Sequence, residues 1–225
     1  MATVALPVVP KYLYRYRPLR PEILGREIEA IEFPYIWCAK FEELNDPMEG
    51  YFSPTNRLAK LREVLADIKS GLADVGIGAL SDTFKSDLMW AHYASNWTGI
   101  CIEYEAKKLI EALPQDATIV RMAYNDAPAQ LGRQDTKDTI TEAVKKAFSQ
   151  KKDIWAYERE WRVLGSVGKN HIGNMQAVRR VFFGPRICPS HEQQIRTALD
   201  RIKIECQSIE VKDYRIIDPD PDSSS

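Results

Sequence analysis

The stretch YLYRYR, residues 12–17, is the clearest β-strand pattern in the chain and sets the fold class. Successive side chains of a strand point to opposite faces, so the tyrosines share one face and the arginines lie on the other. Prolines at positions 18 and 21 end the strand. We expect the tyrosine face to pack on the core. The two sets are Tyr12, Tyr14 and Tyr16 on one side, and Leu13, Arg15 and Arg17 on the other.

Further helix and strand patterns follow this strand without a strict β-α-β rhythm. This favours an α+β fold, with a single domain over residues 1–217, a mixed or antiparallel sheet and peripheral helices. The tail 218–225, DPDPDSSS, has no apolar anchor and is expected to be disordered. Apolar stripes predict helices at 22–31, 54–72 (capped by Ser53), 87–97, 106–113 and 136–152, and a last one that begins with a capping box at Ser190. Alternation and short apolar runs predict strands at 35–39, 77–84, 100–104, 119–124, 155–164, 178–183, 204–211 and 214–217.

Composition excludes several classes of protein. Of the 225 residues 44% are hydrophobic and 28% are charged, which is typical of a globular domain. The 31 basic residues face 32 acidic ones, so no overall positive field attracts nucleic acid, although a local patch is compatible with this balance. The sequence has no run of about 18 apolar residues that would predict a membrane span. Its first ten residues are apolar but lack the basic region of a signal peptide. The four cysteines form no C-x-x-C pair. We therefore expect a cytoplasmic protein with free thiols and no membrane partner.

Arg15 and Arg17 are the first candidate binding residues. Guanidinium groups grip carboxylates and phosphates through two parallel hydrogen bonds, so this pair is suited to the phosphate of a ligand. The alternative is a cross-strand salt bridge or a solvated face.

The segment Asn45–Asp46–Pro47–Met48–Glu49 is the second candidate. A proline pushes the residue before it into an extended conformation, and Asn and Asp bond their own backbone in turns. The segment is therefore either a structural turn or a rigid loop that presents Asn45, Asp46 or Glu49 to a ligand.

The third candidate, Met89–Trp90–Ala91–His92–Tyr93, is expected on a short helix. Trp90 and Tyr93 are suited to stacking on a ligand ring, whereas a lone histidine such as His92 is more often structural than a ligand-binding group. The three histidines of the chain have no second histidine or cysteine at ligand spacing, so no metal site is predicted here.

The fourth candidate is the stretch WAYEREWR, residues 155–162, interpreted as part of one strand. Glu158, Glu160 and Arg162 then share a face. Two neighbouring carboxylates repel each other unless a positive group lies beside them, and Arg162 or an arginine of the first strand would supply it. The face is either an ion-pair ladder or a site whose carboxylates hold a ribose hydroxyl or stabilise a cationic centre.

No G-x-G-x-x-G, Walker A or G-x-S-x-G motif occurs, which excludes the common dehydrogenase, P-loop and α/β-hydrolase sites. The segments LYRYRP, LNDPMEG, LMWAHYASNWTGICIEY, KKDIWAYEREWRVL and VFFGPRI, in this order between residues 13 and 187, together resemble the bacterial family catalogued as domain of unknown function 2971 (DUF2971). Met48 stands where the family usually has phenylalanine, a change that keeps the apolar volume. The resemblance implies a bacterial protein, often encoded near mobile elements or phage defence genes, and assigns no activity.

The chain also resembles mono-ADP-ribosyltransferase-like folds, in which a first-strand arginine, a serine-containing strand and a Glu-x-Glu strand follow one another. Here Arg15 or Arg17, Ser81, and the pair Glu158 and Glu160 follow in that order. The resemblance implies NAD as co-substrate. The arginine would bind a phosphate, Ser81 would order the site, and Glu160 would bind the nicotinamide ribose and stabilise positive charge in the transition state. The serine strand departs from the family's Ser-Thr-Ser pattern by an aspartate.

Three functions stay open at this point. The first is an enzyme that acts on a nucleotide or nucleic acid, for example by ADP-ribosyl transfer, with Glu158 and Glu160 as catalytic residues. The second is a non-enzymatic binding or regulatory module in which the same charges pair with one another. The third is a nuclease with Mg²⁺ held by Asp46, Glu49 and the two later glutamates, although the usual lysine or histidine signature is missing around Glu-x-Glu.

Overall fold

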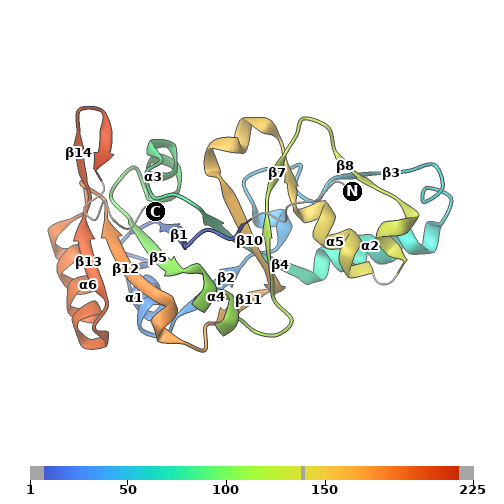
Figure 1. Cartoon of the computed structure of the whole chain (residues 1–225). Coiled ribbons are helices and arrows are strands. Elements are labelled where there is room, and N and C mark those ends of the chain that lie inside the picture. Colours follow the sequence, from blue (N-terminus) through green and yellow to red (C-terminus); the bar gives the residue numbers. More distant parts are fainter. Residues whose placement is uncertain (1–7, 138–139, 218–225) are drawn as a thin grey trace. The chain divides into compact units, whose positions relative to one another are not determined.

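A mixed sheet runs through the computed structural model, which describes residues 8–137 and 140–217 (Figure 1). Its strands are β1 (Tyr12–Arg17), β4 (Val75–Ser81), β5 (Ile100–Glu105), β6 (Thr118–Arg121), β10 (Glu160–Ser166), β12 (Val178–Phe183) and β13 (Glu205–Ser208). Hydrogen bonds connect them in the order β13-β12-β5-β1-β4-β10-β6. β12 and β13 are parallel, whereas β1 and β5 are antiparallel. The predicted α+β class with a mixed sheet is therefore confirmed.

The described residues pack into two compact units. Unit 1 contains residues 8–35, 80–113 and 171–217, and unit 2 contains residues 36–79 and 114–170 apart from 138–139. Each unit is built from segments that are distant in sequence. The predicted tail at 218–225 lies outside the described residues.

Unit 1 is organised around β1, which lies between β5 and the end of β4. The predicted bounds of β1 are confirmed, but both of its faces are covered. Leu13 is fully buried, and Arg15 on the same face is only 8% exposed, so the arginine face is not a solvated one. Helices pack on this sheet as Figure 1 shows: α1 (Leu24–Glu32) lies against α6 (Pro189–Ile202), α3 (Asp87–Tyr93) against β1, and α4 (Ala106–Ala112) against β5.

Unit 2 has its own hydrophobic core, to which α2 (Arg62–Asp74) and α5 (Ile140–Phe148) contribute side by side (Figure 1). Leu72 of α2 and Phe148 of α5 are buried in it together with Leu164 of β10. The remaining short strands are β2 (Tyr35–Cys38), β3 (Phe52–Pro54), β7 (Ala123–Tyr124), β8 (Ala129–Leu131), β9 (Gln150–Lys151), β11 (Gly168–His171), β14 (Glu210–Lys212) and β15 (Arg215–Ile217).

The helix predicted at 54–72 begins only at Arg62. Ser53 and Pro54, expected to cap and begin it, lie instead in β3, which pairs with β8. The fixed φ of proline suits a short strand as well as a first helical turn, and the pairing with β8 decides between them. Leu58 is fully buried, so it contributes to the core without being helical.

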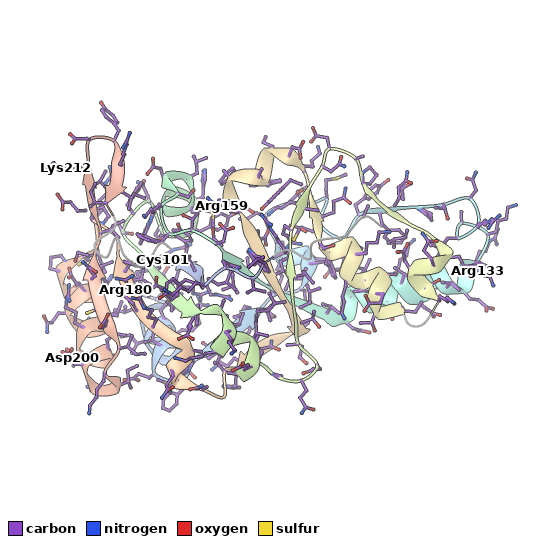
Figure 2. The ribbon with its side chains drawn as sticks, viewed as in Figure 1. Cys101, Arg133, Arg159, Arg180, Asp200 and Lys212 are labelled. Atoms are coloured by element: carbon purple, nitrogen blue, oxygen red, sulfur yellow. The ribbon has the colours of Figure 1, made fainter. Side chains whose placement is uncertain are left out.

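The strand predicted at 155–164 is wrong in its first half. Asp153–Glu158 form a 3-10 helix, Arg159 has a left-handed backbone (φ 48°), and the strand begins at Glu160. Figure 2 labels Arg159 at this turn. Glu158 and Glu160 therefore do not lie on one face of a strand, and a different geometry brings them together.

Several other boundaries differ because local turns end the periodic patterns early. The helix predicted to reach Trp97 ends at Tyr93, since Ser95, Asn96 and Trp97 all have positive φ. Cys188, not Ser190, is the N-cap of α6, and Pro189 is its first residue. Residues 133–136 form a separate 3-10 helix before α5, and the strand predicted at 204–211 is divided between β13 and β14.

Phe148 offers a test of the unit 2 core. It is fully buried, and its ring fills the space beside Gly50, where an added Cβ would lie 2.8 Å from Phe148 Cε1. Phe148→Ala should lower the free energy of unfolding by roughly 3–5 kcal/mol, because a large buried ring is replaced by a cavity. Urea unfolding measures this. Phe33→Ala removes a ring that is 66% exposed and should change stability by less than about 0.5 kcal/mol; equal losses in the two variants would contradict the core assignment.

Candidate functional site

Two of the candidate segments, 113 residues apart, meet in unit 2 through Arg162 and Glu49. Arg162 Nη1 donates to Glu49 Oε2 at 2.7 Å, and Arg162 Nη2 donates to Glu49 Oε1 at 2.6 Å. Arg162 Nε also donates to Glu160 Oε1 at 2.8 Å, and Nη1 donates to the carbonyl of Phe148 at 3.1 Å. The guanidinium thus joins the Asn45–Glu49 segment, the end of α5 and β10.

Lys151, on β9, lies at the point where three carboxylates converge. Its Nζ is 2.6 Å from Glu158 Oε2, 3.3 Å from Glu160 Oε2 and 3.6 Å from Glu49 Oε1. The charge of Lys151 offsets the repulsion between Glu158 and Glu160. On a shared strand face, Arg162 or an arginine of the first strand was expected to have this role. We call these five side chains, Glu49, Lys151, Glu158, Glu160 and Arg162, the charged network.

Burial and neighbouring charges act in opposite directions on three members of the charged network, Lys151, Glu160 and Arg162. Burial disfavours the charge of Glu160, but Arg162 and Lys151 beside it outweigh this and hold the pKa of the carboxyl below its usual range. Burial likewise opposes the charges of Lys151 and Arg162, yet the surrounding carboxylates raise the pKa of each above its ordinary value. The carboxyl group of Glu160 therefore lies between two cationic side chains that favour its charged form.

Two aromatic side chains complete this environment. The backbone N–H of Glu160 donates to the Tyr124 hydroxyl at 2.7 Å, and burial raises the pKa of that phenol above its usual value, so it stays protonated. The Trp155 ring covers Lys151 with its centroid 4.8 Å from Nζ, within the range of a cation–π contact.

A small hollow of about 90 Å³ lies beside the charged network. Its volume is well below the roughly 300 Å³ of pockets for drug-sized ligands, so it admits one small polar group. Of the network, Glu49 and Lys151 reach it, whereas Glu158, Glu160 and Arg162 do not line it. The other lining residues are Asp46, Met48, Tyr51, Asn125, Asp126, Ala127, Pro128, Gln150 and Lys152. We call this the polar hollow.

The Asn45–Glu49 segment is a turn that also forms one wall of the hollow, so both interpretations of it describe part of the structure. Asp46 Oδ1 accepts the N–H of Met48 at 2.9 Å, and the Asp46 carbonyl accepts the N–H of Glu49 at 3.1 Å. Asp46 and Glu49 are buried, whereas Asn45 is exposed and does not line the hollow.

The predicted residues from the first strands lie in unit 1. Arg17 pairs with the buried Glu27, with both hydrogen bonds at 2.6 Å, and this pair raises the Arg17 pKa against the effect of burial. Arg15 is buried on β1. Ser81 is fully buried, and its Oγ accepts the N–H of Thr83 at 3.3 Å. These side chains thus belong to a different unit from Glu158 and Glu160.

The aromatic helix also lies in unit 1. Trp90 is fully buried, donates its indole N–H to the Phe84 carbonyl at 2.8 Å, and packs against Tyr16 and Trp97. His92 is exposed and Tyr93 is half-buried on the same helix, α3. Trp90 therefore contributes to core packing.

Sequence reasoning missed two residues that organise these units. Lys151 belongs to no recognisable motif, but the adjacent lysines at the start of KKDIWAYERE are a signal of positive charge near Glu-x-Glu. Glu103 was hidden in an apolar strand pattern. It is fully buried on β5, accepts from Tyr14 Oη at 3.1 Å and pairs with Arg179 and Arg180 at 2.6 and 3.0 Å. Figure 2 labels Arg180.

Within residues 8–137 and 140–217, no group of three or more histidine, cysteine, aspartate or glutamate side chains is arranged to hold a metal ion. Lys151 Nζ stands where the carboxylates of the nuclease hypothesis converge, so a magnesium ion there would have to displace an ammonium group. The helices in this described part of the chain are all too short or too polar to cross a membrane.

Residues 89–163 match the model of a family described as "Protein of unknown function (DUF2971)". The match covers most of α3, all of β5 and the segment that contains Glu158, Glu160 and Arg162, and it agrees with the resemblance of the sequence motifs to this family. No curated protein and no solved structure matches the chain. The family description names no activity, so a function has to be argued from the geometry.

Arg162→Met should unfold far more easily than the unchanged protein. The substitution leaves Glu49 and Glu160 buried with one remaining cation, which costs roughly 3–5 kcal/mol in the free energy of unfolding near pH 7. Urea unfolding is the measurement. Arg121→Met, on the exposed side of the adjacent strand β6, is the control and should cost less than about 0.5 kcal/mol. A loss below about 1 kcal/mol in Arg162→Met would show that the charged network does not stabilise unit 2.

Glu160 predicts a pH dependence. Its folded-state pKa lies below the ordinary value of 4.5, so its contribution is present above pH 4.5 and is lost as the pH falls through the folded pKa. Glu160→Gln should cost roughly 3 kcal/mol at pH 7, and this difference should shrink as the pH is lowered from 4.5. Chemical unfolding of both proteins across that range measures the difference; one that stays constant with pH would contradict the assignment.

Proposed function

We propose that this DUF2971 protein is a nucleotide-binding module in which the charged network shapes the binding site and performs no chemistry. The observation that carries the proposal is that Glu158 and Glu160 are already bonded to Lys151 and Arg162. Glu160 is 4% exposed and Glu158 is 3% exposed, so neither presents a carboxylate to a substrate. A general acid or base needs to reach the reacting group directly or through one water molecule.

The polar hollow supplies the contacts for the ligand. Tyr51 is 59% exposed at its rim, where the phenol ring is available for stacking on a base. Lys152 is an exposed cation suited to a phosphate, and Asn125 and Asp126 are exposed acceptors suited to ribose hydroxyls. The hollow itself holds one small group, and the remainder of the nucleotide would lie across the rim.

The walls of the hollow are fixed before a ligand arrives. Asp46 bonds the turn that follows it, Glu49 is held by Arg162, and the Gln150 side chain donates to the carbonyl of Ala127. A site that is already ordered loses little conformational entropy on binding. This is what a recognition module requires.

ADP-ribosyl transfer is the second candidate, and the ionised state of Glu160 favours it. A carboxylate that stays charged is the group that stabilises positive charge at a ribose carbon. In this alternative Glu160 would have to exchange part of its bonding to Arg162 for a bond to the ribose. Turnover would then depend on Glu160, whereas nucleotide binding at the rim would not depend on it.

Thermal unfolding in the presence of NAD, ADP-ribose or ATP tests the main proposal. A nucleotide at about 100 times its dissociation constant stabilises the folded state by about 2.7 kcal/mol. For a chain of this length that raises Tm by roughly 5–10 °C. Tyr51→Ala and Lys152→Gln should abolish most of the shift. Their matched controls are Tyr214→Ala and Lys60→Gln, which change an exposed tyrosine and an exposed lysine outside the hollow.

Release of nicotinamide from NAD separates the two candidates. The binding module shows a nucleotide-dependent rise in Tm and no nicotinamide release. Release that occurs in the unchanged protein and is lost in Glu160→Gln would replace the main proposal with the transferase. Absence of both the shift and the release would overturn both.

A further inference from the structure

A second and larger cavity lies in unit 2, away from the residues of the charged network. Its volume is about 520 Å³, within the range of roughly 300–1,000 Å³ that small-molecule sites occupy. It is formed by α2, α5, the start of β4 and the end of β10, with the loop before β6. The lining residues are Asp67, Ser70, Gly71, Asp74, Val75, Asp116, Thr118, Ile140, Thr141, Val144, Lys145, Leu164, Gly165 and Ser166. We call it the α2–α5 cavity.

The floor of the α2–α5 cavity is apolar. Val144 and Leu164 are buried core residues, and Ile140 is partly buried against them. Gly71 deepens the cavity on the α2 side, because a Cβ at this position would lie 3.0 Å from Val144 Cγ2 and 3.5 Å from Ile140 Cγ2. Such a floor favours a ligand with a hydrocarbon body, since the ligand buries apolar surface on both sides of the contact.

The rim of the cavity is acidic. Asp67, Asp74 and Asp116 line it, and Ser166 Oγ donates to Asp116 Oδ2 at 3.1 Å. Asp67 and Asp74 are exposed, and within the described part of the chain neither forms a hydrogen bond or an ion pair. The one cation in the lining, Lys145, is bonded to Glu142 at 3.0 Å. The cavity thus presents net negative charge to a ligand.

The spacing of the acids gives the shape of the ligand. Asp67 and Asp74 are seven residues apart on α2, two helical turns, so they lie on one face of the helix about 10 Å apart along its axis. Between them the same face carries Ser70 and Gly71, above the apolar floor. A compact cation would reach one carboxylate at a time, whereas a linear chain with an ammonium group at each end would reach both.

We propose that the α2–α5 cavity binds a linear polyamine, with its methylene segments on the floor and its ammonium groups at Asp67, Asp74 and Asp116. The combination of an apolar floor with carboxylates at two-turn spacing carries this assignment. Anionic nucleotides are disfavoured here because the rim would repel their phosphates. This site is independent of the polar hollow and of the function proposed for it.

Isothermal titration with spermidine, a linear triamine, tests the proposal at about 0.15 M salt, where weak surface attraction is largely screened. We expect one saturable site. The probe controls are 1,8-octanediol, which is uncharged and has a similar chain, and MgCl₂ at matched ionic strength. Neither should compete with spermidine.

Three variants locate the site. Asp67→Asn combined with Asp74→Asn should weaken spermidine binding about tenfold or more, which corresponds to two ion pairs of up to about 1 kcal/mol each. Ser70→Trp fills the space between the two acids with an exposed side chain and should also weaken it. Glu63→Gln removes an exposed acid of the same helix outside the cavity, and it should leave the affinity unchanged within about twofold.

Loss of binding can be distinguished from loss of folding in these variants. The substituted side chains are exposed, and circular dichroism checks that every variant keeps its fold. Loss in the double variant and in Ser70→Trp, with retention in Glu63→Gln, supports the polyamine site. Equal weakening in Glu63→Gln and the double variant would assign the binding to general surface charge. That result, competition by MgCl₂ or octanediol, or the absence of saturable heat would overturn the proposal.

Discussion

The buried pair between Arg162 and Glu49 is the interaction on which unit 2 depends. It bridges 113 residues of sequence with two hydrogen bonds, and the same guanidinium holds Glu160 and the carbonyl at the end of α5. Removing such charges from water is costly, and the cost is offset only when every polar atom finds a partner in good geometry. Arg162 meets that condition because its guanidinium bonds three parts of unit 2: Glu49, Glu160 at the start of β10 and the carbonyl at the end of α5. Breaking the pair is therefore costly, because the partner that remains would be buried without its counter-charge.

The position of Lys151 follows from this constraint. Arg162 hydrogen-bonds two carboxyl groups but carries a single positive charge, and Glu158 brings a third carboxyl group to the same place. A second cation is required, and Lys151 on β9 meets all three acids at once. The left-handed residue Arg159 makes the convergence work, because it turns the chain between a 3-10 helix and β10 so that both acids face the lysine. A continuous strand would have placed the two carboxylates in a row instead.

Much of the fold was predictable from local patterns, whereas the connections between distant segments were not. β1 and β12 were predicted at their observed bounds because alternation and apolar runs are strong local signals. Pro54 was predicted to begin a helix, whereas it ends the short strand β3. The sequence around a proline is similar in both cases, and the pairing of β3 with β8 distinguishes them. The charged segments around Glu49 and Glu160 were recognised by composition and family resemblance. Their bonding to each other depends on tertiary packing, which the periodic pattern of side chains along one sequence does not encode.

The polar hollow and the α2–α5 cavity differ in a way that bears on recognition. Glu49 and Lys151, the members of the charged network that line the polar hollow, are already bonded to other side chains. A ligand could bond them only by displacing an existing partner, which would leave a buried charge unpaired. Selectivity there has to come from exposed side chains of the rim, such as Tyr51 and Lys152. In the α2–α5 cavity, Asp67 and Asp74 form no such bonds in the described chain, and a cationic ligand meets their charges directly. Ionic strength should therefore affect the two kinds of binding differently, since screening acts most strongly on exposed charges.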